Sequence, residues 1–255
     1  MATVEMQSRF CGWRAAGMAL LAFSTTTLGS SAQTFATLAP FNRTNGLAPV
    51  SVVQGFDGNF YGTTTGGGAY RSGTVFKITS SGALTTLYSF CALATCADGS
   101  FPESGLVLAT DGNLYGTTSD GGFDNAGTFF RVTRAGKLTT LYSFCGKIYC
   151  TDGLHPFGPL IQATDGNFYG TTEFGGTDDY GTVFKMSAHG APTILYNFCH
   201  TTKCPDGAVP NGQLIQSADG NIFGTTTSGG GPQFGGTVFR MTPAGKLTTL
   251  TAFAP

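Results

Sequence analysis

The chain has 255 residues, a length that suits one medium domain or two small ones. Its formal net charge is -1 and only 11% of its residues are charged, which argues against a surface for nucleic acid or anionic membranes, because both need basic clusters. The 39 glycines, 22 phenylalanines and 9 tyrosines favour short strands joined by tight turns around an aromatic core. We therefore expect no nucleic-acid partner and an ordered, strand-rich fold.

Residues 1–32 have the pattern of a secretory signal peptide. Arg9 and Arg14 precede an apolar run of about nine residues, and small residues up to Ala32 form a cleavage pattern. This run is too short for a bilayer, which needs about 20 apolar residues, and no later run is long enough. We expect cleavage after Ala32, a secreted or cell-surface location, and a single domain over residues 33–255 without a membrane span.

The remaining sequence repeats itself with a period of 54 residues. The string D-G-N-x-[YF]-G-T-T, the string G-T-[VF]-F and the string L-Y-[SN]-F-C each recur with this spacing. A fixed period of this length is typical of solenoids and propellers. The first string starts at Asp57, Asp111, Asp165 and Asp219, the second at Gly73, Gly127, Gly181 and, one residue late, Gly236, and the third at Leu87, Leu141 and Leu195.

Each unit contains four strand-like runs. In the third unit these are residues 159–164, 167–172, 181–187 and 193–198. The Asp-Gly pair between the first two runs is a strong hairpin signal, since glycine accepts the positive φ of a tight turn. Four antiparallel strands of this length make one propeller blade. The sequence therefore predicts an all-β propeller of about four four-stranded blades, with an open β-repeat arc as the alternative; the units span about residues 47–90, 104–144, 158–198 and 212–253.

The two ends carry the same type of strand. Residues 35–41 (FATLAPF) resemble residues 247–253 (LTTLTAF), so the mature chain has four units and one surplus N-terminal strand. In a closed ring one copy could complete or cover a terminal blade, whereas in an open arc both would shield edges. We favour the closed ring.

The repeated strings resemble the GloVer-type tandem-repeat proteins, which are exported bacterial proteins with a choice of anchors. Their unit reads G-L-I-Q-A-x-D-G-N-F-Y-G-T-T, then G-T-V-F-K-I-T, then L-T-T-L-Y-S-F. Residues 160–172, 73–79 and 137–144 match it almost letter for letter. The resemblance covers the whole mature chain and implies an exported, repetitive β protein whose biochemical role is not established.

Six cysteines of the mature chain form three C-x4-C pairs that lie 54 residues apart. Fifteen pairings are possible, but the repetition favours three local disulfides, and export makes oxidation plausible. Zinc would need four ligands, and no unit supplies further Cys or His in register; redox chemistry is the remaining alternative. We expect structural disulfides that contribute about 2 kcal/mol each. The pairs are Cys91 with Cys96, Cys145 with Cys150, and Cys199 with Cys204.

The repeated aspartates and the histidines are interpreted as turn and loop residues with no catalytic or metal-binding role. A carboxylate ring could hold Ca²⁺, yet the Asp-Gly turn explains Asp57 and its three equivalents, and a second Asp-Gly set is interpreted in the same way. The histidines are expected to be exposed loop residues, and Asp178-Asp179 a solvated pair. We predict no catalytic, cofactor-binding or metal-binding residues and no cofactor. The second set is Asp98, Asp152 and Asp206, and the histidines are His155, His189 and His200.

Two functions from different classes remain. The first is a non-enzymatic exported module with a binding or structural role, whose loops present a surface to a glycan or an extracellular protein. It is favoured because residues that repeat in every unit are scaffold, whereas catalysis needs residues unique to one unit. The alternative is an extracellular polysaccharide hydrolase or lyase, which needs convergent acids in one pocket. The non-repeating candidates for these acids are Glu103, Asp120, Asp124, Glu173 and Asp178.

Overall fold

The computed structural model describes residues 36–231 and 235–254. The predicted signal peptide, residues 1–32, lies outside the described residues. Contacts divide the chain into Met1–Ala36 and Thr37–Pro255, and every strand described here belongs to the second unit.

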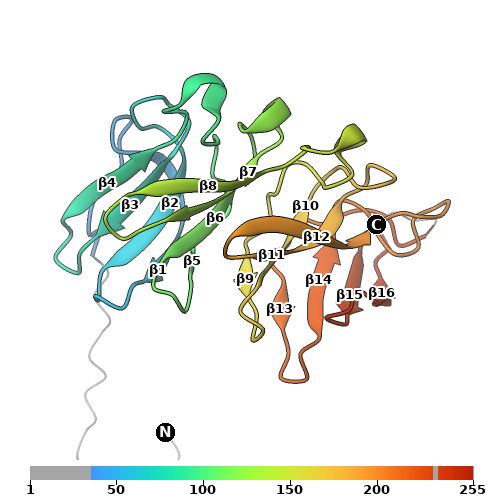
Figure 1. The fold of residues 1–255 in the computed structure, drawn as a ribbon. Helices are drawn as coiled ribbons and strands as arrows, with labels where there is room; N and C mark the ends of the chain where they lie inside the picture. Colours follow the sequence, from blue (N-terminus) through green and yellow to red (C-terminus); the bar gives the residue numbers. More distant parts are fainter. Residues whose placement is uncertain (1–35, 232–234, 255) are drawn as a thin grey trace, which may run out of the picture. The chain divides into compact units, whose positions relative to one another are not determined.

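Four antiparallel four-stranded sheets follow one another along the chain, each with its strands in sequence order (Figure 1). We call them blades 1 to 4. Blade 1 has β1 (Leu47–Gln54), β2 (Phe60–Gly66), β3 (Thr74–Ile78) and β4 (Leu84–Ser89). Blade 2 has β5 (Val107–Leu108), β6 (Leu114–Thr118), β7 (Thr128–Val132) and β8 (Leu138–Ser143). Blade 3 has β9 (Ile161–Gln162), β10 (Phe168–Thr172), β11 (Thr182–Ser187) and β12 (Gly190–Asn197). Blade 4 has β13 (Ile215–Gln216), β14 (Ile222–Thr226), β15 (Thr237–Met241) and β16 (Leu247–Ala252).

The predicted all-β architecture of four four-stranded blades is confirmed. Three single-turn 3-10 helices interrupt the loops: η1 (Ala94–Cys96), η2 (Phe123–Asn125) and η3 (Ile148–Cys150). The innermost strands of blades 2 to 4 are shorter than expected, with two residues each. In blade 3 the reason is local, because Pro159 has no N–H for a ladder and the N–H of Ala163 already closes the hairpin turn on the carbonyl of Asn167 (2.9 Å).

Two repeated motifs explain the centre of each blade. Gly170 in β10 faces Phe184 in the paired strand β11, and a Cβ on this glycine would come within 2.6 Å of the Phe184 ring. The last threonine of each G-T-T string is buried and forms a hydroxyl–hydroxyl bond with the threonine that opens the next strand, as Thr172 and Thr182 do at 2.8 Å. The same bond recurs as Thr64 with Thr74, Thr118 with Thr128, and Thr226 with Thr237.

Each blade has two faces that differ in their partners. The forward face packs on the following blade, and the backward face packs on the preceding one. Between blades 2 and 3, Tyr115 and Phe129 of the forward face contact Phe168 of the backward face, with ring centroids 4.3 and 5.6 Å apart. The same positions form the cores between blades 1 and 2 and between blades 3 and 4. Because these aromatic faces are shared, each inner blade depends on its neighbours for a core.

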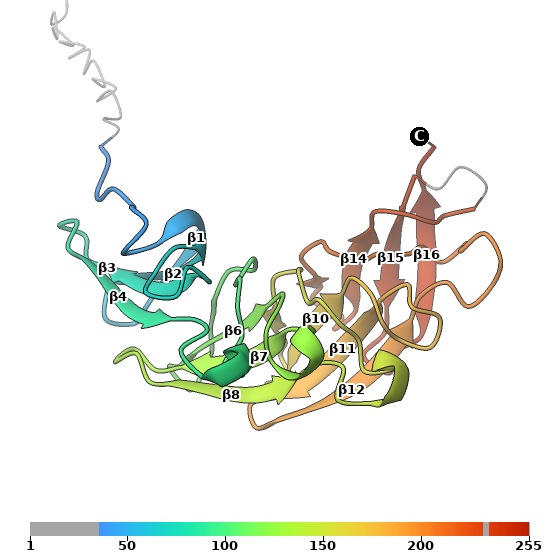
Figure 2. The ribbon, with the colours of Figure 1, turned by 90° about the horizontal axis from the view of Figure 1, so that it is seen from above.

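The phenylalanine that ends each L-Y-[SN]-F string packs one blade against the next, and we call it the fastening phenylalanine. Phe90, Phe144 and Phe198 are fully buried. Their rings lie 5.1, 5.3 and 5.4 Å from Phe130, Phe184 and Phe239 of the following blade. This contact recurs between the sheets that follow one another along the chain. Figure 2 shows the strands of these sheets from above.

The prediction of a surplus N-terminal strand is wrong, since residues 36–42 form no strand. Pro40 cannot donate to a ladder, which disfavours a strand there. The segment nevertheless contacts blade 1 as the outer strand of a preceding blade contacts its neighbour elsewhere in the chain. Phe41 lies 4.9 Å from Phe76 of blade 1, as the fastening phenylalanines do elsewhere. The carbonyl of Leu38 lies against Gly82, as the carbonyl of Leu87 does against Gly136.

The two end faces of the blade series are less covered than the faces between blades. Among the described residues no hydrophobic core joins blade 4 to blade 1. Phe253 holds the fastening position in blade 4 but is 52% exposed. Val52 of β1 is 58% exposed, whereas its repeat equivalent Leu160 is 1% exposed. These end faces are therefore partly exposed, and Leu38 and Phe41 of the N-terminal segment line the one on blade 1.

Candidate functional site on the loops of blades 2 and 3

The aspartates of the D-G-N strings are structural turn residues. Asp57 accepts hydrogen bonds from the backbone N–H of Asn59 (3.3 Å), its side-chain amide (2.9 Å) and the Tyr61 hydroxyl (2.8 Å). These bonds, the one from Asn59 foremost, lower the pKa of Asp57 to about 2. The same bonds hold Asp111 and Asp165, and Asp219 accepts from Asn221 and Ser217.

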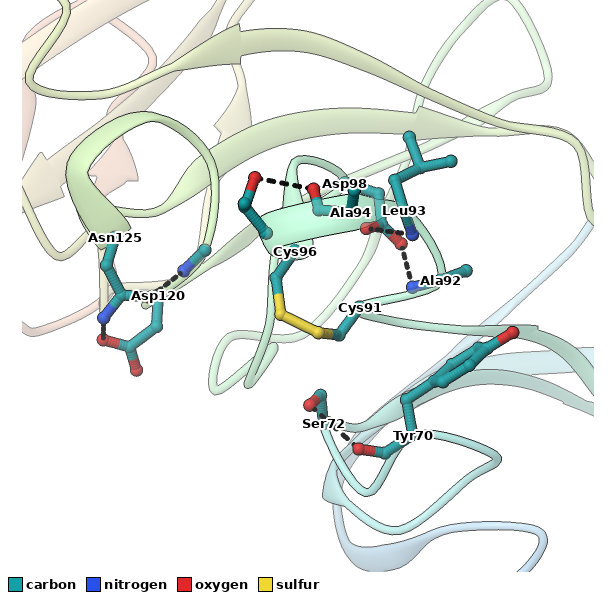
Figure 3. The surroundings of a disulfide bond; sticks show 12 residues. Tyr70, Ser72, Cys91, Ala92, Leu93, Ala94, Cys96, Asp98, Asp120 and Asn125 are labelled. Carbon is teal, nitrogen blue, oxygen red and sulfur yellow. Dashed lines mark hydrogen bonds between the residues drawn. A yellow bond between two sulfur atoms is a disulfide. The ribbon is translucent and has the colours of Figure 1, made fainter.

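The second aspartate set has a larger role than a turn. Asp98 is fully buried and accepts bonds from the N–H groups of Ala92 (2.9 Å) and Leu93 (3.1 Å) (Figure 3). It also accepts a bond from the Tyr88 hydroxyl (2.7 Å). Burial, and then the bond to this carboxylate, raises the pKa of Tyr88. Asp152 accepts from Tyr142 and the N–H of Gly146 in the same way, and Asp206 from Tyr196 and the N–H of Cys199. The set therefore ties each cysteine loop to the outer strand of its blade.

The three cysteine pairs form local disulfides in the structure. Cys91 is linked to Cys96, Cys145 to Cys150, and Cys199 to Cys204. Figure 3 places the first of them beside Asp98, at the turn η1. Disulfides and buried aspartates thus hold the cysteine loops.

Four titratable residues that break the repeat lie instead in the loops of blades 2 and 3. Asp120 follows β6, His155 and Glu173 belong to the loops around β9 and β10, and Glu103 precedes β5. The Nδ1 atom of His155 lies 2.8 Å from the carbonyl oxygen of Ser119 and 3.6 Å from Oδ1 of Asp120. At the matching positions of blade 4 the chain carries Asn211, Val209, Thr227 and Ser228. We call Glu103, Asp120, His155 and Glu173 the acidic–histidine cluster.

Backbone bonds hold the cluster in place. The N–H of His155 donates to the carbonyl of Ala126 (2.9 Å), and the N–H of Glu173 donates to the carbonyl of His155 (3.0 Å). Asp120 is bridged to Ser100 in antiparallel fashion. The Asp120 carboxylate also accepts from the Asn125 amide at 3.3 Å, a contact visible in Figure 3. Loops of two blades therefore fix the relative positions of Asp120, His155 and Glu173.

The charges of the cluster act on one another. Burial raises the pKa of Glu103, and the nearby carboxylates of Asp120 and Glu173 raise it further while His155 lowers it. Burial also raises the pKa of Glu173, with His155 again opposing. The contact between Nδ1 of His155 and the Ser119 carbonyl orients the imidazole ring. The cluster thus combines carboxylates that hold protons more readily than usual with one oriented imidazole.

Aromatic side chains border the cluster. The rings of Phe157 and Phe174 lie 6.2 and 6.3 Å from the His155 ring. Phe174 is partly exposed, and the side chains of His155 and Asp120 are 28% and 29% exposed. The surface therefore offers both apolar ring faces and hydrogen-bonding groups to a ligand.

The structure unites some of the predicted acids and separates others. Glu103, Asp120 and Glu173 belong to one cluster, but Asp124 lies in η2 and Asp178 pairs with His200 at 3.0 Å. The prediction for His155 was wrong in part, because this histidine is half-buried and partnered. The sequence did contain a signal for it, since His155 stands before a proline at a position where the other units have Phe101 and Val209.

The structure also bears on metals and membranes. Within residues 36–231 and 235–254 no group of three or more His, Cys, Asp or Glu side chains could hold a metal ion. The same residues contain no helix with the length and hydropathy needed to cross a bilayer.

Comparison with known proteins identifies a family. The model of the Gloeobacter/Verrucomicrobia repeat matches residues 8–204, which is most of the chain. A comparison with curated proteins found no match.

Solved structures with a similar fold are distant. A puromycin-hydrolyzing peptidase of Mycobacterium tuberculosis has 15% identity and a TM-score of 0.48, over 82% of this chain and 30% of its own. A luciferin-regenerating enzyme has 15% identity and a TM-score of 0.45, over 80% and 62%. Xylan β-1,4-xylosidase of Bacillus halodurans C-125 has 15% identity and a TM-score of 0.42, over 84% and 46%. The chain thus spans less than two thirds of each, and this likeness carries no argument about activity.

Proposed function

The chain belongs to the Gloeobacter/Verrucomicrobia repeat family, and we propose that it is an exported, non-enzymatic module that binds an extracellular glycan through the acidic–histidine cluster. Three disulfides suggest an oxidising environment outside the cytoplasm, which supports a secreted or cell-surface location. The signal-peptide pattern of residues 1–32 supports the same location.

One observation carries the proposal: four titratable residues that depart from the repeat lie in neighbouring loops of blades 2 and 3. A repeat protein keeps its scaffold residues in every unit, as it does with Asp57 and its equivalents. Glu103, Asp120, His155 and Glu173 are not needed by the scaffold, because other units hold the same loops with neutral residues. Such local departures mark the surface on which a loop-bearing scaffold binds its ligand.

The chemistry of the surface favours a sugar. Carboxylates and an imidazole accept hydrogen bonds from hydroxyl groups, and the faces of aromatic rings such as Phe157 and Phe174 suit the apolar faces of sugar rings. Glycan hydroxyls supply many donors without charge, which fits a surface that is rich in acceptors.

A glycan array with the purified chain tests the proposal, followed by titration of the best ligand. We expect Asp120→Asn, His155→Ala and Glu173→Gln each to weaken binding by about tenfold or more, because each removes a hydrogen bond to the ligand. The matched control is Thr227→Ala, at the position of blade 4 that corresponds to Glu173. Absence of glycan binding, or an equal loss in the control, would refute the proposal.

A polysaccharide hydrolase is a second candidate, favoured by the raised pKa of Glu103 and Glu173 beside Asp120. A carboxyl group that stays protonated can act as a general acid, while a second carboxylate acts as nucleophile or base. Release of reducing sugar from bound glycans, lost in both Glu103→Gln and Glu173→Gln, would support this function over simple binding. Unchanged glycans after prolonged incubation would exclude it for those substrates.

A further inference from the structure

The two end faces of the blade series are uncovered versions of surfaces that pack together elsewhere. A forward face meets a backward face three times within the chain, between blades 1 and 2, 2 and 3, and 3 and 4. Blade 4 therefore presents a forward face, and blade 1 a backward face, that lack this covering among the described residues.

The forward face of blade 4 keeps the residue types of the covered faces. Phe223 and Val238 are partly exposed and Thr225 is exposed. In blade 3 the equivalent Tyr169, Thr171 and Val183 are at most 1% exposed. The difference arises from the missing neighbour, because the side chains are nearly the same.

The backward face of blade 1 contains an apolar groove of about 430 Å³. Val50, Val52, Phe60 and Ile78 line it, together with Leu38 and Phe41 of the N-terminal segment. In blade 3 the equivalents of Val52 and Phe60 are Leu160 and Phe168, and both are buried against blade 2. The groove thus has the position and the character of half an interface between blades.

Blade 1 also carries the acceptor residue of a polar contact that recurs between successive blades. Gln162 accepts a bond at Oε1 from the N–H of Thr110 in the preceding blade (2.9 Å), and Gln216 accepts one from Thr164 (2.9 Å). Gln54 is their equivalent in blade 1, and its amide nitrogen is held on the carbonyl of Gly58 as that of Gln162 is on Gly166. Gln54 therefore shares the residue type and the amide contact of the two glutamines that bond a preceding blade.

We propose that the occupant of both faces is a second copy of this chain, whose blade 4 packs on blade 1 and whose blade 1 packs on blade 4. The N–H of Ala218 of one copy, the equivalent of Thr110 and Thr164, donates to Gln54 of the other. Two copies then associate through two equivalent interfaces that are related by a two-fold axis. A second copy fits these faces because the same pairing of a forward face with a backward face is formed three times within each chain.

Residues 37–41 hold the place of the partner's last strand. Leu38 and Phe41 contact blade 1 as Leu87 and Phe90 contact blade 2. Leu250 and Phe253 of the partner copy would take the same positions on blade 1. Both sets cannot lie there together. The segment forms no strand, whereas β16 is paired with β15 along its length, so the segment yields on association. It therefore weakens pairing by competing for the site.

Sedimentation of the purified chain over a wide range of concentration tests the proposal. We expect a reversible equilibrium between one and two copies. Val238→Asp and Val52→Asp, at partly exposed positions of the two faces, should each raise the dimer dissociation constant by about a hundredfold or more, because each places a charge in an apolar interface. Ile148→Asp is the control, since Ile148 is 78% exposed on a cysteine loop and should leave pairing unchanged.

The competing segment gives a change in the opposite direction. Leu38→Ala combined with Phe41→Ala should lower the dimer dissociation constant by about tenfold or more, because the segment then holds the site less well. Circular dichroism establishes that each variant is folded. A monomer at every concentration, polymers that grow beyond two copies, or pairing that both face variants leave intact would overturn the proposal.

Discussion

One repeat position allows a quantitative test of the packing between blades, because it is covered by a following blade in blade 3 and uncovered in blade 4. Phe198 is fully buried, with its ring 5.4 Å from Phe239 and 5.2 Å from Tyr196. Its equivalent in blade 4, Phe253, is 52% exposed. Replacing a buried phenylalanine by alanine removes its transfer free energy and leaves a cavity, which costs about 3–5 kcal/mol. Phe198→Ala should therefore lower the free energy of unfolding by about 4 kcal/mol, and Phe253→Ala by about 1 kcal/mol or less, because half of its side chain is already in water.

Urea unfolding followed by circular dichroism measures both losses, with the disulfides intact and at a dilution at which the chain is monomeric. The two variants remove the same atoms from the same repeat position, so the difference reports the covering blade alone. Equal losses would refute the reasoning, since they would mean that blade 4 is covered as fully as blade 3.

Three further predictions concern the loops. Asp152→Ala should lower the free energy of unfolding in urea by about 3 kcal/mol, because it leaves Tyr142 and the N–H of Gly146 without their buried acceptor; a loss no larger than that of the exposed-turn variant Asp219→Ala would contradict this. Reduction of the three disulfides should lower the free energy of unfolding by about 2 kcal/mol for each short loop opened, and an unchanged urea midpoint after complete reduction would count against it. Burial raises the pKa of Glu173 in the folded state, so its protonated form stabilises the fold at low pH and this contribution is lost as pH rises through the folded pKa. Glu173→Gln should thus be more stable than the parent at neutral pH and equally stable below the usual glutamate pKa, and a thermal melting difference independent of pH would disprove that account.

Much of the fold follows from local sequence. The Asp-Gly pairs determine the hairpins, since Gly166 has φ of 79° in the tight turn. The fixed period predicts four copies of one blade, and the threonines of the G-T-T strings pair because their strands are in register. These features depend on residues that are close together in the sequence.

Features that depend on neighbouring blades could not be predicted in this way. Val183 and Val238 are the same residue at the same repeat position, yet only the first is buried, so exposure there reflects the adjacent blade and not the local sequence. The acidic–histidine cluster likewise joins loops that are far apart in the chain, such as those of Glu103 and Glu173. The repeat alignment marks such residues as unusual, but only the packing of blade 2 on blade 3 brings them together.

Hydroxyl-radical footprinting of the dilute monomer tests the packing of the blades most directly. Mass spectrometry of the peptides compares the oxidation rates of Phe90, Phe144, Phe198 and Phe253, which share one repeat position. We predict slow oxidation of the first three, which are buried between blades, and rapid oxidation of Phe253. Similar rates at all four positions would contradict a series of blades that share aromatic faces and end in an open one.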